Sequence, residues 1–174
     1  MSKIAQDLTR FKAAIFDIDG VLSRQTVNMD PAGRPIRTTN VRDGYALAQC
    51  AKLGFTVGII TGGKGDQIEL RFEPLGIKHL YLWANDKLPC LRDFCEKTGI
   101  ASEDIIYCGD DIPDLPVMRE VGLAVCPADA APEVKEIAHY ISPVIGGEGV
   151  ARDILEQVLK AQGKWIKSSE AYGW

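Results

Sequence analysis

The chain has 174 residues, of which 46% are hydrophobic and 25% charged, a composition typical of globular proteins that excludes a disordered or fibrous chain. At roughly 150 residues per domain this length predicts a single domain, residues 1–174. The net charge of −4 offers no electrostatic attraction to nucleic acid or to an anionic membrane, so we expect neither as a partner.

Short apolar runs alternate with stretches of helical spacing along the chain. Nearly continuous apolar runs predict strands that are covered on both faces; they are Ala13–Ile18, Phe55–Ile60, Leu80–Trp83, Ile105–Cys108, Leu123–Cys126 and Tyr140–Ser142. Helical spacing falls at Gly44–Leu53, Lys64–Leu75, Lys87–Thr98, Pro113–Glu120, Pro132–Ala138 and Val150–Gln162. This alternation predicts an α/β fold with a doubly wound, Rossmann-like parallel sheet.

Residues 23–41 interrupt the alternation after the first strand. The segments Thr26–Met29 and Pro35–Thr39 flank the sequence Asp-Pro-Ala-Gly, in which Pro31 suits the second position of a type I turn and Gly33 the fourth. We interpret this segment as an inserted β-hairpin.

Two observations bear on the location of the protein. No apolar run approaches the roughly 20 residues of a membrane span, and the segment MSKIAQDLTRFKAA lacks the apolar stretch of a signal peptide. We therefore expect a cytoplasmic protein.

Five cysteines without CxxC spacing indicate neither a disulfide framework nor a zinc site.

Polar residues follow several predicted strands, at the edge of the sheet where open parallel sheets bind ligands. In extended chain Asp17 and Asp19 point to the same side. Thr61 and Gly62 follow the second strand, Lys87 begins the helix after the third, and Asp110, Asp111 and Asp114 follow the fourth. So many carboxylates in one crevice require a cation, and Mg²⁺ prefers carboxylate and phosphate oxygens. Lys87 and the Thr61 hydroxyl would then hold an anionic group, which predicts phosphoryl chemistry.

Taken singly, these residues have plainer interpretations. Asp110, Asp111 or Asp114 could each be a helix N-cap, and Lys87 could be an exposed helix residue. Together and in order, however, DIDGV at 17–21, Thr61, Lys87 and GDDIPD at 109–114 resemble the four motifs of the haloacid dehalogenase superfamily of phosphatases.

The resemblance implies a haloacid dehalogenase fold and a role for each matched residue. Asp17 is expected to be the nucleophile that forms an aspartyl-phosphate, and Asp19 the acid and then the base. Mg²⁺ would be held by the Asp17 carboxylate, the Asp19 backbone carbonyl and Asp110. The remaining matches are expected to contact the phosphoryl oxygens (Thr61 and Lys87) or to orient Lys87 and metal-bound water (Asp111 and Asp114).

Many members of that superfamily carry a cap domain, inserted after the first or second strand, that closes over the substrate. Here the first insertion is the hairpin, and the chain from Thr61 to Leu80 leaves room for one helix. We therefore expect a capless enzyme.

The whole chain resembles the 3-deoxy-D-manno-octulosonate 8-phosphate (Kdo-8-phosphate) phosphatases of lipopolysaccharide synthesis. The matching segments are FDIDGVLS, TTNVRDGYAL at 38–47, IITGG, LGIKHLY, GDDIPDLPVMREVGL at 109–123 and GGEGVARDILEQVL at 146–159. The resemblance implies substrate contacts at Asn40, Val41, Arg42, Asp43, Gly44, Gly62 and Arg71. Arg42 and Arg71 suit the carboxylate of an α-keto acid, although each could also be a plain surface arginine.

Two positions depart from that family. Gly63 and Ala48 stand where many members have arginine, so one or two substrate contacts are expected to differ. A nine-carbon keto acid 9-phosphate, of a sialic acid or deaminated neuraminate, is therefore an alternative substrate. An alternative of another class is a non-catalytic oligomerisation module.

The family forms homotetramers in which hairpins pair across subunits and a neighbour helps to cover each site. An isolated two-stranded hairpin is marginal in water and its edges invite pairing, so this chain is expected to be a homo-oligomer, most simply a homotetramer. The tail Lys164–Trp174, with Trp165, Tyr172 and Trp174, could plug a neighbouring crevice or dock on its own subunit.

Overall fold

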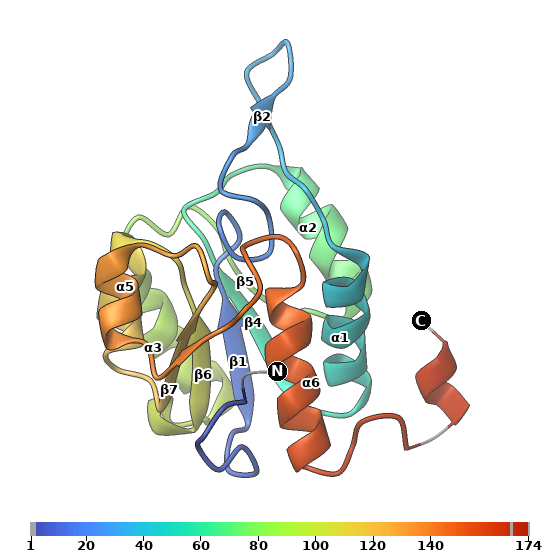
Figure 1. Ribbon diagram of the computed structural model, residues 1–174. Coiled ribbons are helices and arrows are strands. Elements are labelled where there is room, and N and C mark those ends of the chain that lie inside the picture. The colour runs from blue at the N-terminus through green and yellow to red at the C-terminus, as the bar shows by residue number, and fades with distance from the viewer. Residues whose placement is uncertain (1–2, 168, 174) are drawn as a thin grey trace.

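A six-stranded sheet forms the centre of the computed structural model, which describes residues 3–167 and 169–173 (Figure 1). Its neighbouring strands all run parallel, in the order β5-β4-β1-β6-β7-β8. The strands are β1 (Ala13–Phe16), β4 (Thr56–Ile60), β5 (His79–Tyr81), β6 (Ile105–Cys108), β7 (Leu123–Cys126) and β8 (Tyr140–Ile141). The prediction of a doubly wound parallel sheet is confirmed.

Helices cover both faces of this sheet (Figure 1). They are α1 (Val41–Lys52), α2 (Asp66–Phe72), α3 (Lys87–Thr98), α4 (Leu115–Met118), α5 (Pro132–Ile137) and α6 (Val150–Ala161). Short 3₁₀ turns lie at Glu73–Leu75, Ser102–Asp104, Ile112–Asp114 and Ser169–Tyr172. Within the described residues, no helix is both long enough and apolar enough to cross a bilayer.

Alternation along β1 divides the core into two layers, because successive strand residues point to opposite faces. Ala14 and Phe16 pack in the cluster that includes residues of α1 and α6. Ala13 and Ile15 pack in the cluster that includes residues of α3, α4 and α5. With both faces buried, the strand reads as an unbroken apolar run.

The connections leave β1 and β6 in opposite directions, since the chain passes from β1 toward β4 and β5 but from β6 toward β7 and β8. Such a reversal opens a crevice at the carboxyl ends of the two strands, where ligands of doubly wound sheets bind. Asp17 and Gly109 are the first residues after β1 and β6. The fold therefore places two of the predicted acidic motifs side by side.

Several predicted boundaries were wrong, including those of α2, α4 and the hairpin strands, and three of them have a clear local reason. The third strand is His79–Tyr81, because its partner β4 ends opposite Tyr81 and Trp83 has a left-handed φ of 57°. Helix α1 begins at Val41 rather than Gly44, because the Asn40 side chain accepts hydrogen bonds from the backbone N–H groups of Arg42 and Asp43. Strand β1 ends at Phe16, and the chain then turns.

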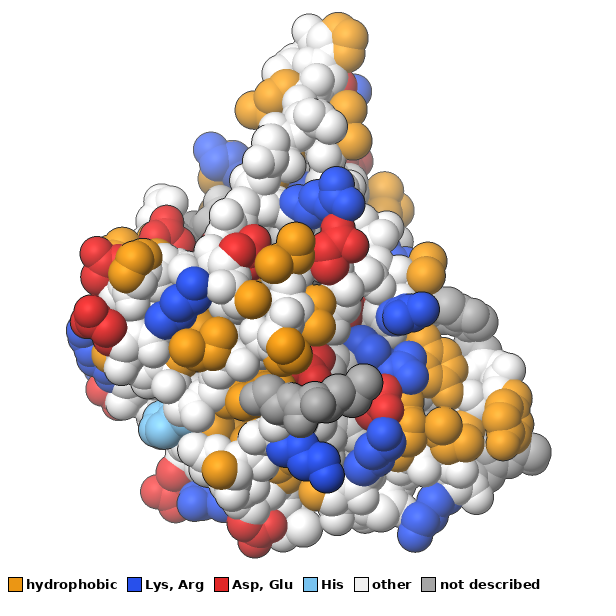
Figure 2. All heavy atoms as spheres, viewed as in Figure 1, with side chains coloured by type: hydrophobic (Ala, Val, Ile, Leu, Met, Phe, Trp, Pro, Cys, Tyr) orange, Lys and Arg blue, Asp and Glu red, His pale blue; other side chains and the backbone are white. Residues whose placement is uncertain are grey.

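The inserted hairpin is present and projects beyond the sheet (Figure 1). Its strands β2 (Asn28–Met29) and β3 (Pro35–Ile36) are antiparallel, and the turn between them is closed by a 2.9 Å bond from the Gly33 N–H to the Asp30 carbonyl. Met29 and Ile36 are 65% and 55% exposed, and apolar side chains are visible on this projection in Figure 2.

The C-terminal tail contacts α1 of its own chain. The Tyr45 hydroxyl donates to the carbonyl of Ala171, and the Gln49 amide donates to that of Gly173. The Trp165 ring meets the Tyr45 ring edge-on, with centroids 5.8 Å apart. Of the two placements considered, docking on the same subunit is the one seen, while Trp174 lies outside the described residues. All five cysteines are free, as expected.

Candidate active site

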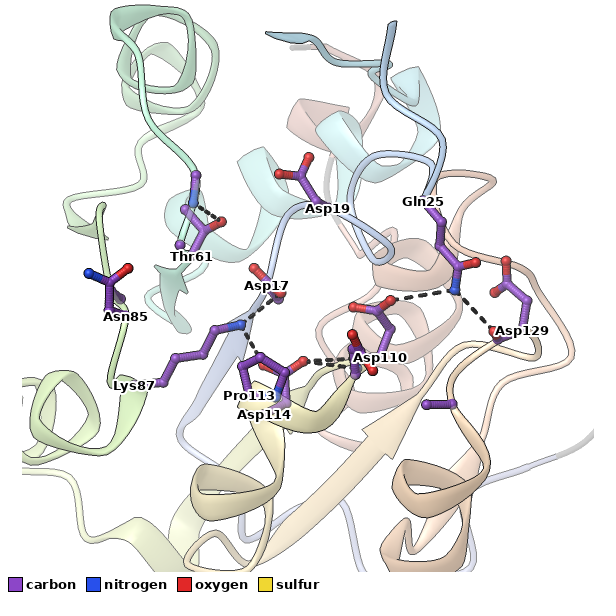
Figure 3. A pocket seen from close by; sticks show the side chains of 15 residues that line it. Asp17, Asp19, Gln25, Thr61, Asn85, Lys87, Asp110, Pro113, Asp114 and Asp129 are labelled. Atoms are coloured by element: carbon purple, nitrogen blue, oxygen red, sulfur yellow. Dashed lines mark hydrogen bonds and ion pairs between the residues drawn. The ribbon is translucent and has the colours of Figure 1, made fainter.

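A cavity of about 700 Å³ opens at the carboxyl ends of β1, β4 and β6 (Figure 3). Its walls include eight of the residues selected from the sequence: Asp17, Asp19, Thr61, Gly62, Lys87, Asp110, Asp111 and Asp114. In Figure 3 the side chains of Asp17 and Asp110 lie between Lys87 on one side and Gln25 on the other.

Lys87, the first residue of α3, is only 4% exposed. Its Nζ lies 2.7 Å from Asp17 Oδ2 and 2.6 Å from Asp114 Oδ1. Burial alone would lower the pKa of Lys87, but the two carboxylates outweigh it and raise that pKa. The lysine therefore presents a fixed positive charge at the floor of the cavity.

Asp114 has no oxygen to spare for a metal ion. Its Oδ1 accepts from Lys87 and from the Tyr107 hydroxyl (2.6 Å), and its Oδ2 accepts from the backbone N–H groups of Asp110 (2.9 Å) and Asp111 (3.3 Å). These bonds tie the loop after β6 to the lysine. Asp114 therefore holds the Lys87 side chain and the backbone of this loop in fixed relative positions.

Asp17 and Asp110 form the electrostatic centre of the cavity. Burial and the nearby Asp114 carboxylate raise the pKa of Asp17 to about 6, against the pull of Lys87. Burial, followed by Asp17 and Asp114, raises the pKa of Asp110 to about 7. Gly20, with a φ of 88°, lets Asp110 approach, since a Cβ there would lie 1.9 Å from Asp110 Oδ2.

This cluster fits a hard divalent cation. One carboxylate oxygen from each of Asp17, Asp110 and Asp114 lies within 4.8 Å of the others, and the donors are all oxygen, as Mg²⁺ prefers. Because Asp114 is already saturated with hydrogen bonds, Asp17 and Asp110 are the two carboxylates that remain for the ion.

Asp19 lies at the mouth of the cavity, where its side chain is 36% exposed. Arg37, just beyond β3, binds it through both carboxylate oxygens: Nε lies 2.8 Å from Oδ1 and Nη2 lies 2.9 Å from Oδ2. Thr61 is buried, and its Oγ1 accepts from the Gly63 N–H at 3.0 Å, which leaves the hydroxyl proton available to a ligand.

Sequence reasoning missed several residues around the cavity, among them Gln25, Arg37 and Asp129. Gln25 bridges the Asp110 carboxylate (3.4 Å) and the Asp129 carbonyl (3.0 Å), and Arg37 holds Asp19. Asp129 could have been found, because it follows β7 as the other acidic residues follow β1 and β6. Nothing in the sequence places Gln25 or Arg37, which come from the arms of the hairpin, over the site.

The remaining predicted substrate residues do not line this cavity. Asn40, Asp43, Gly44 and Arg71 border a separate small cleft between α1 and α2, Arg42 faces a groove beside α6, and Val41 is exposed. Asp43 is buried, and its Oδ1 accepts from the Arg152 N–H at 2.6 Å. Burial raises the pKa of Asp43 to about 6. Within one chain, the residues predicted for phosphoryl chemistry and these predicted substrate residues therefore lie in different places.

Comparison with known proteins finds a matching family and similar phosphatases. The profile of the haloacid dehalogenase-like hydrolases matches residues 84–154. The 3-deoxy-D-manno-octulosonate 8-phosphate phosphatase KdsC of Escherichia coli K12 is 43% identical over 86% of this chain and 80% of its own.

Two solved structures extend the comparison. The Yersinia pestis 3-deoxy-D-manno-octulosonate 8-phosphate phosphatase superposes with a TM-score of 0.89 at 37% identity, covering 92% of this chain and 87% of its own. The Moraxella catarrhalis phosphatase of that name, in complex with magnesium, phosphate and KDO, has a TM-score of 0.87 at 32% identity and covers 92% of both chains.

Proposed function

The chain belongs to the 3-deoxy-D-manno-octulosonate 8-phosphate phosphatases, within the haloacid dehalogenase-like hydrolases, and we infer that it hydrolyses Kdo-8-phosphate to Kdo and inorganic phosphate. The observation that carries this conclusion is the buried Asp17–Lys87–Asp114 arrangement beside Asp110 at the carboxyl ends of β1 and β6. It joins an anion-binding charge to a cation site in one cavity.

The reaction runs in two steps at Asp17. In the first, a carboxylate oxygen of Asp17 attacks phosphorus, the ester P–O bond breaks, and the proton of Asp19 passes to the leaving alkoxide. In the second, Asp19 accepts a proton from water, whose oxygen attacks phosphorus and breaks the aspartyl-phosphate bond. The position of Asp17 beside a fixed lysine and of Asp19 at the mouth supports these roles.

Mg²⁺ is the cofactor. The Asp17 and Asp110 carboxylates and the backbone carbonyl of Asp19 would hold it, with Asp111 beside them to orient bound water. When bound, the ion neutralises the charge of the phosphoryl group and of the surrounding carboxylates. The raised pKa values of Asp17 and Asp110 support this assignment, because the protein alone leaves these two charges poorly compensated.

Lys87, the Thr61 hydroxyl and the Gly62 backbone form the cradle for the phosphoryl oxygens. Lys87 is held in place by two carboxylates, and the hydroxyl of Thr61 is held by the Gly63 N–H. Donors that are already fixed stabilise developing charge without reorganising during the reaction.

We infer a homotetramer, in which hairpins pair across subunits and a neighbour helps to cover each site. The predicted substrate residues concerned are Asn40, Val41, Arg42, Asp43, Gly44 and Arg71. Two observations support an oligomer: these residues lie outside the cavity of their own chain, and the hairpin exposes Met29 and Ile36. Hairpin edges of this kind pair readily with another chain.

The chain is further inferred to be one capless, cytoplasmic domain. The points where a cap could be inserted hold only the hairpin, after β1, and α2 with its 3₁₀ turn, after β4. Five free cysteines suit a reducing compartment.

The two alternatives are less well supported. A non-catalytic module would have no use for the buried and costly Lys87 pair, and the matched relatives named above carry the name of the eight-carbon phosphatase. A panel of sugar phosphates tests the substrate directly. We expect kcat/KM for Kdo-8-phosphate to exceed that for sialic acid 9-phosphate and for deaminated neuraminate 9-phosphate. A preference for either nine-carbon ester would overturn this assignment while leaving the chemistry intact.

A further inference from the structure

Arg37 reaches the reacting groups from the hairpin, outside the sheet that carries the other site residues. Its side chain is only 10% exposed. Besides the two bonds to the Asp19 carboxylate, its Nη1 donates to the backbone carbonyl of Lys64 at 3.2 Å. The guanidinium thus spans the gap between the loop after β1 and the loop after β4, and every one of its nitrogens is engaged.

Gly63 provides the room for this contact. A Cβ at that position would lie 2.7 Å from Arg37 Nη2, 3.1 Å from Thr61 Oγ1 and 3.2 Å from Arg37 Cζ. Any side chain there would have to displace the guanidinium, so the loop after β4 and Arg37 fit each other only with glycine at this place.

The other hairpin arginine provides a contrast. Arg34 pairs with Asp30 at 2.7 Å within the hairpin itself, and its side chain is 77% exposed. An exposed pair of this kind contributes little. Arg37 instead is largely shielded from solvent, bidentate and bonded to a residue of the catalytic cavity, which is the geometry in which arginine fixes a carboxylate most firmly.

We propose that Arg37 is a positioning residue, which holds the Asp19 carboxylate at the mouth of the cavity in the orientation from which it exchanges protons with the leaving group and with water. This inference rests on the proposed role of Asp19 as acid and base. A bidentate pair occupies one acceptor site on each carboxylate oxygen and leaves the others available. The hairpin thereby contributes to catalysis within its own chain.

The proposal predicts an effect that depends on the leaving group. In the first step, an alkoxide needs the proton of Asp19 when the P–O bond breaks, whereas p-nitrophenolate departs without it. Loss of Arg37 should therefore slow transfer from a sugar phosphate much more than transfer from p-nitrophenyl phosphate. A purely structural role would slow both equally.

The test is the rate of leaving-group release in a single turnover, with saturating Mg²⁺, for Arg37→Gln, Arg37→Lys and Gly63→Ala. For Kdo-8-phosphate we expect Arg37→Gln to lower this rate by about 10- to 100-fold, and for p-nitrophenyl phosphate by less than about threefold. Lysine keeps the positive charge but cannot bind both carboxylate oxygens as the planar guanidinium does, so Arg37→Lys should retain only part of the rate. Arg34→Gln is the matched control and should leave both rates unchanged.

Gly63→Ala tests the same contact with Arg37 still present. We expect it to lower the ratio of the Kdo-8-phosphate rate to the p-nitrophenyl phosphate rate. The double variant should lower this ratio no further than Arg37→Gln alone, because crowding of Thr61 Oγ1 affects both substrates. The proposal is overturned if Arg37→Gln slows both substrates equally, if it slows neither, or if the two single effects on this ratio multiply in the double variant.

Failure of the proposed function would look different. If the unmodified enzyme did not hydrolyse Kdo-8-phosphate but did hydrolyse p-nitrophenyl phosphate, the same contrast would be measured with ribose 5-phosphate, another alkyl ester. Selective loss on that ester would support the role of Arg37 whatever the natural substrate is.

Discussion

At the scale of single residues, the site is a balance between three buried carboxylates and one buried ammonium group. Lys87 compensates Asp17 and Asp114, while the Asp110 carboxylate accepts a hydrogen bond from the side-chain amide of Gln25. Burial, together with the negative charge that Lys87 leaves uncompensated, explains why the pKa values of Asp17 and Asp110 rise to about 6 and about 7.

This excess charge predicts how Mg²⁺ stabilises the fold at different pH values. Carboxylates with a raised pKa in the folded state bind more protons than in the unfolded state, so their contribution to stability falls as pH rises from about 4 to about 7. Mg²⁺ replaces those protons. At pH 8 and a hundred times its Kd it should stabilise by about 2.7 kcal/mol, and at pH 5 by much less.

Thermal unfolding with and without Mg²⁺ measures this difference, and Asp110→Asn is the control. Without metal this variant should be at least as stable as the parent at pH 8, and Mg²⁺ should barely shift its Tm. An equal Mg²⁺ shift in parent and variant would show that the ion binds elsewhere.

The saturated hydrogen bonding of Asp114 leads to a second residue-scale prediction. Asp114→Asn leaves Lys87 with a single carboxylate partner in a buried place, which should cost about 3 kcal/mol of stability and lower kcat by about 100-fold. Asp104→Asn is matched to it, since Asp104 binds the exposed Arg10 and Lys12, and should cost about 0.2–1 kcal/mol.

Urea unfolding and steady-state kinetics of the two variants decide the point. If Asp114→Asn proved as mild as Asp104→Asn, the account of a lysine fixed by two carboxylates would be wrong.

The acidic groups of the site could be located from the sequence because a buried strand followed by a carboxylate is a local pattern. Which carboxylate remains available for a cation could not be predicted from that pattern, since it depends on which atoms approach Asp114. Arg37 shows the limit most clearly, because it meets Asp19 only through the three-dimensional path of the hairpin.

At the scale of elements, the hairpin does more than supply Arg37. It also exposes an apolar surface that includes Met29 and Ile36. If it forms the contact between subunits, the double change Met29→Ser and Ile36→Ser should convert the oligomer to a smaller species. Leu70→Ser in α2, another exposed apolar residue, should leave the mass unchanged. Size-exclusion chromatography with light scattering measures both, and a parent protein that is already monomeric would contradict the assembly.

Element boundaries were predicted less well than element types. Periodicity identifies β5 and α1, but the end of β5 depends on where β4 stops pairing, and the start of α1 depends on the Asn40 cap. The cap also gives Asn40 a structural role that is independent of any substrate contact.

At the scale of the whole molecule, the order of the strands is what turns separate motifs into a site. Asp17 and Asp110 are 93 positions apart in the sequence but follow two paired strands, β1 and β6. The alternation of strands and helices predicts a parallel sheet, whereas strand order is set by packing between distant segments. An arrangement of subunits is even harder to predict from the sequence than strand order, because it depends on surfaces that exist only in the folded chain.

The central claim is that this chain is a Mg²⁺-dependent Kdo-8-phosphate phosphatase that works through Asp17. The most direct measurement is phosphate release from Kdo-8-phosphate by the purified parent and by Asp17→Asn, each with Mg²⁺ and with a chelator. We expect turnover by the parent that the chelator abolishes, and a loss of at least about 1,000-fold in Asp17→Asn. Phosphate release that survives either change would contradict the account.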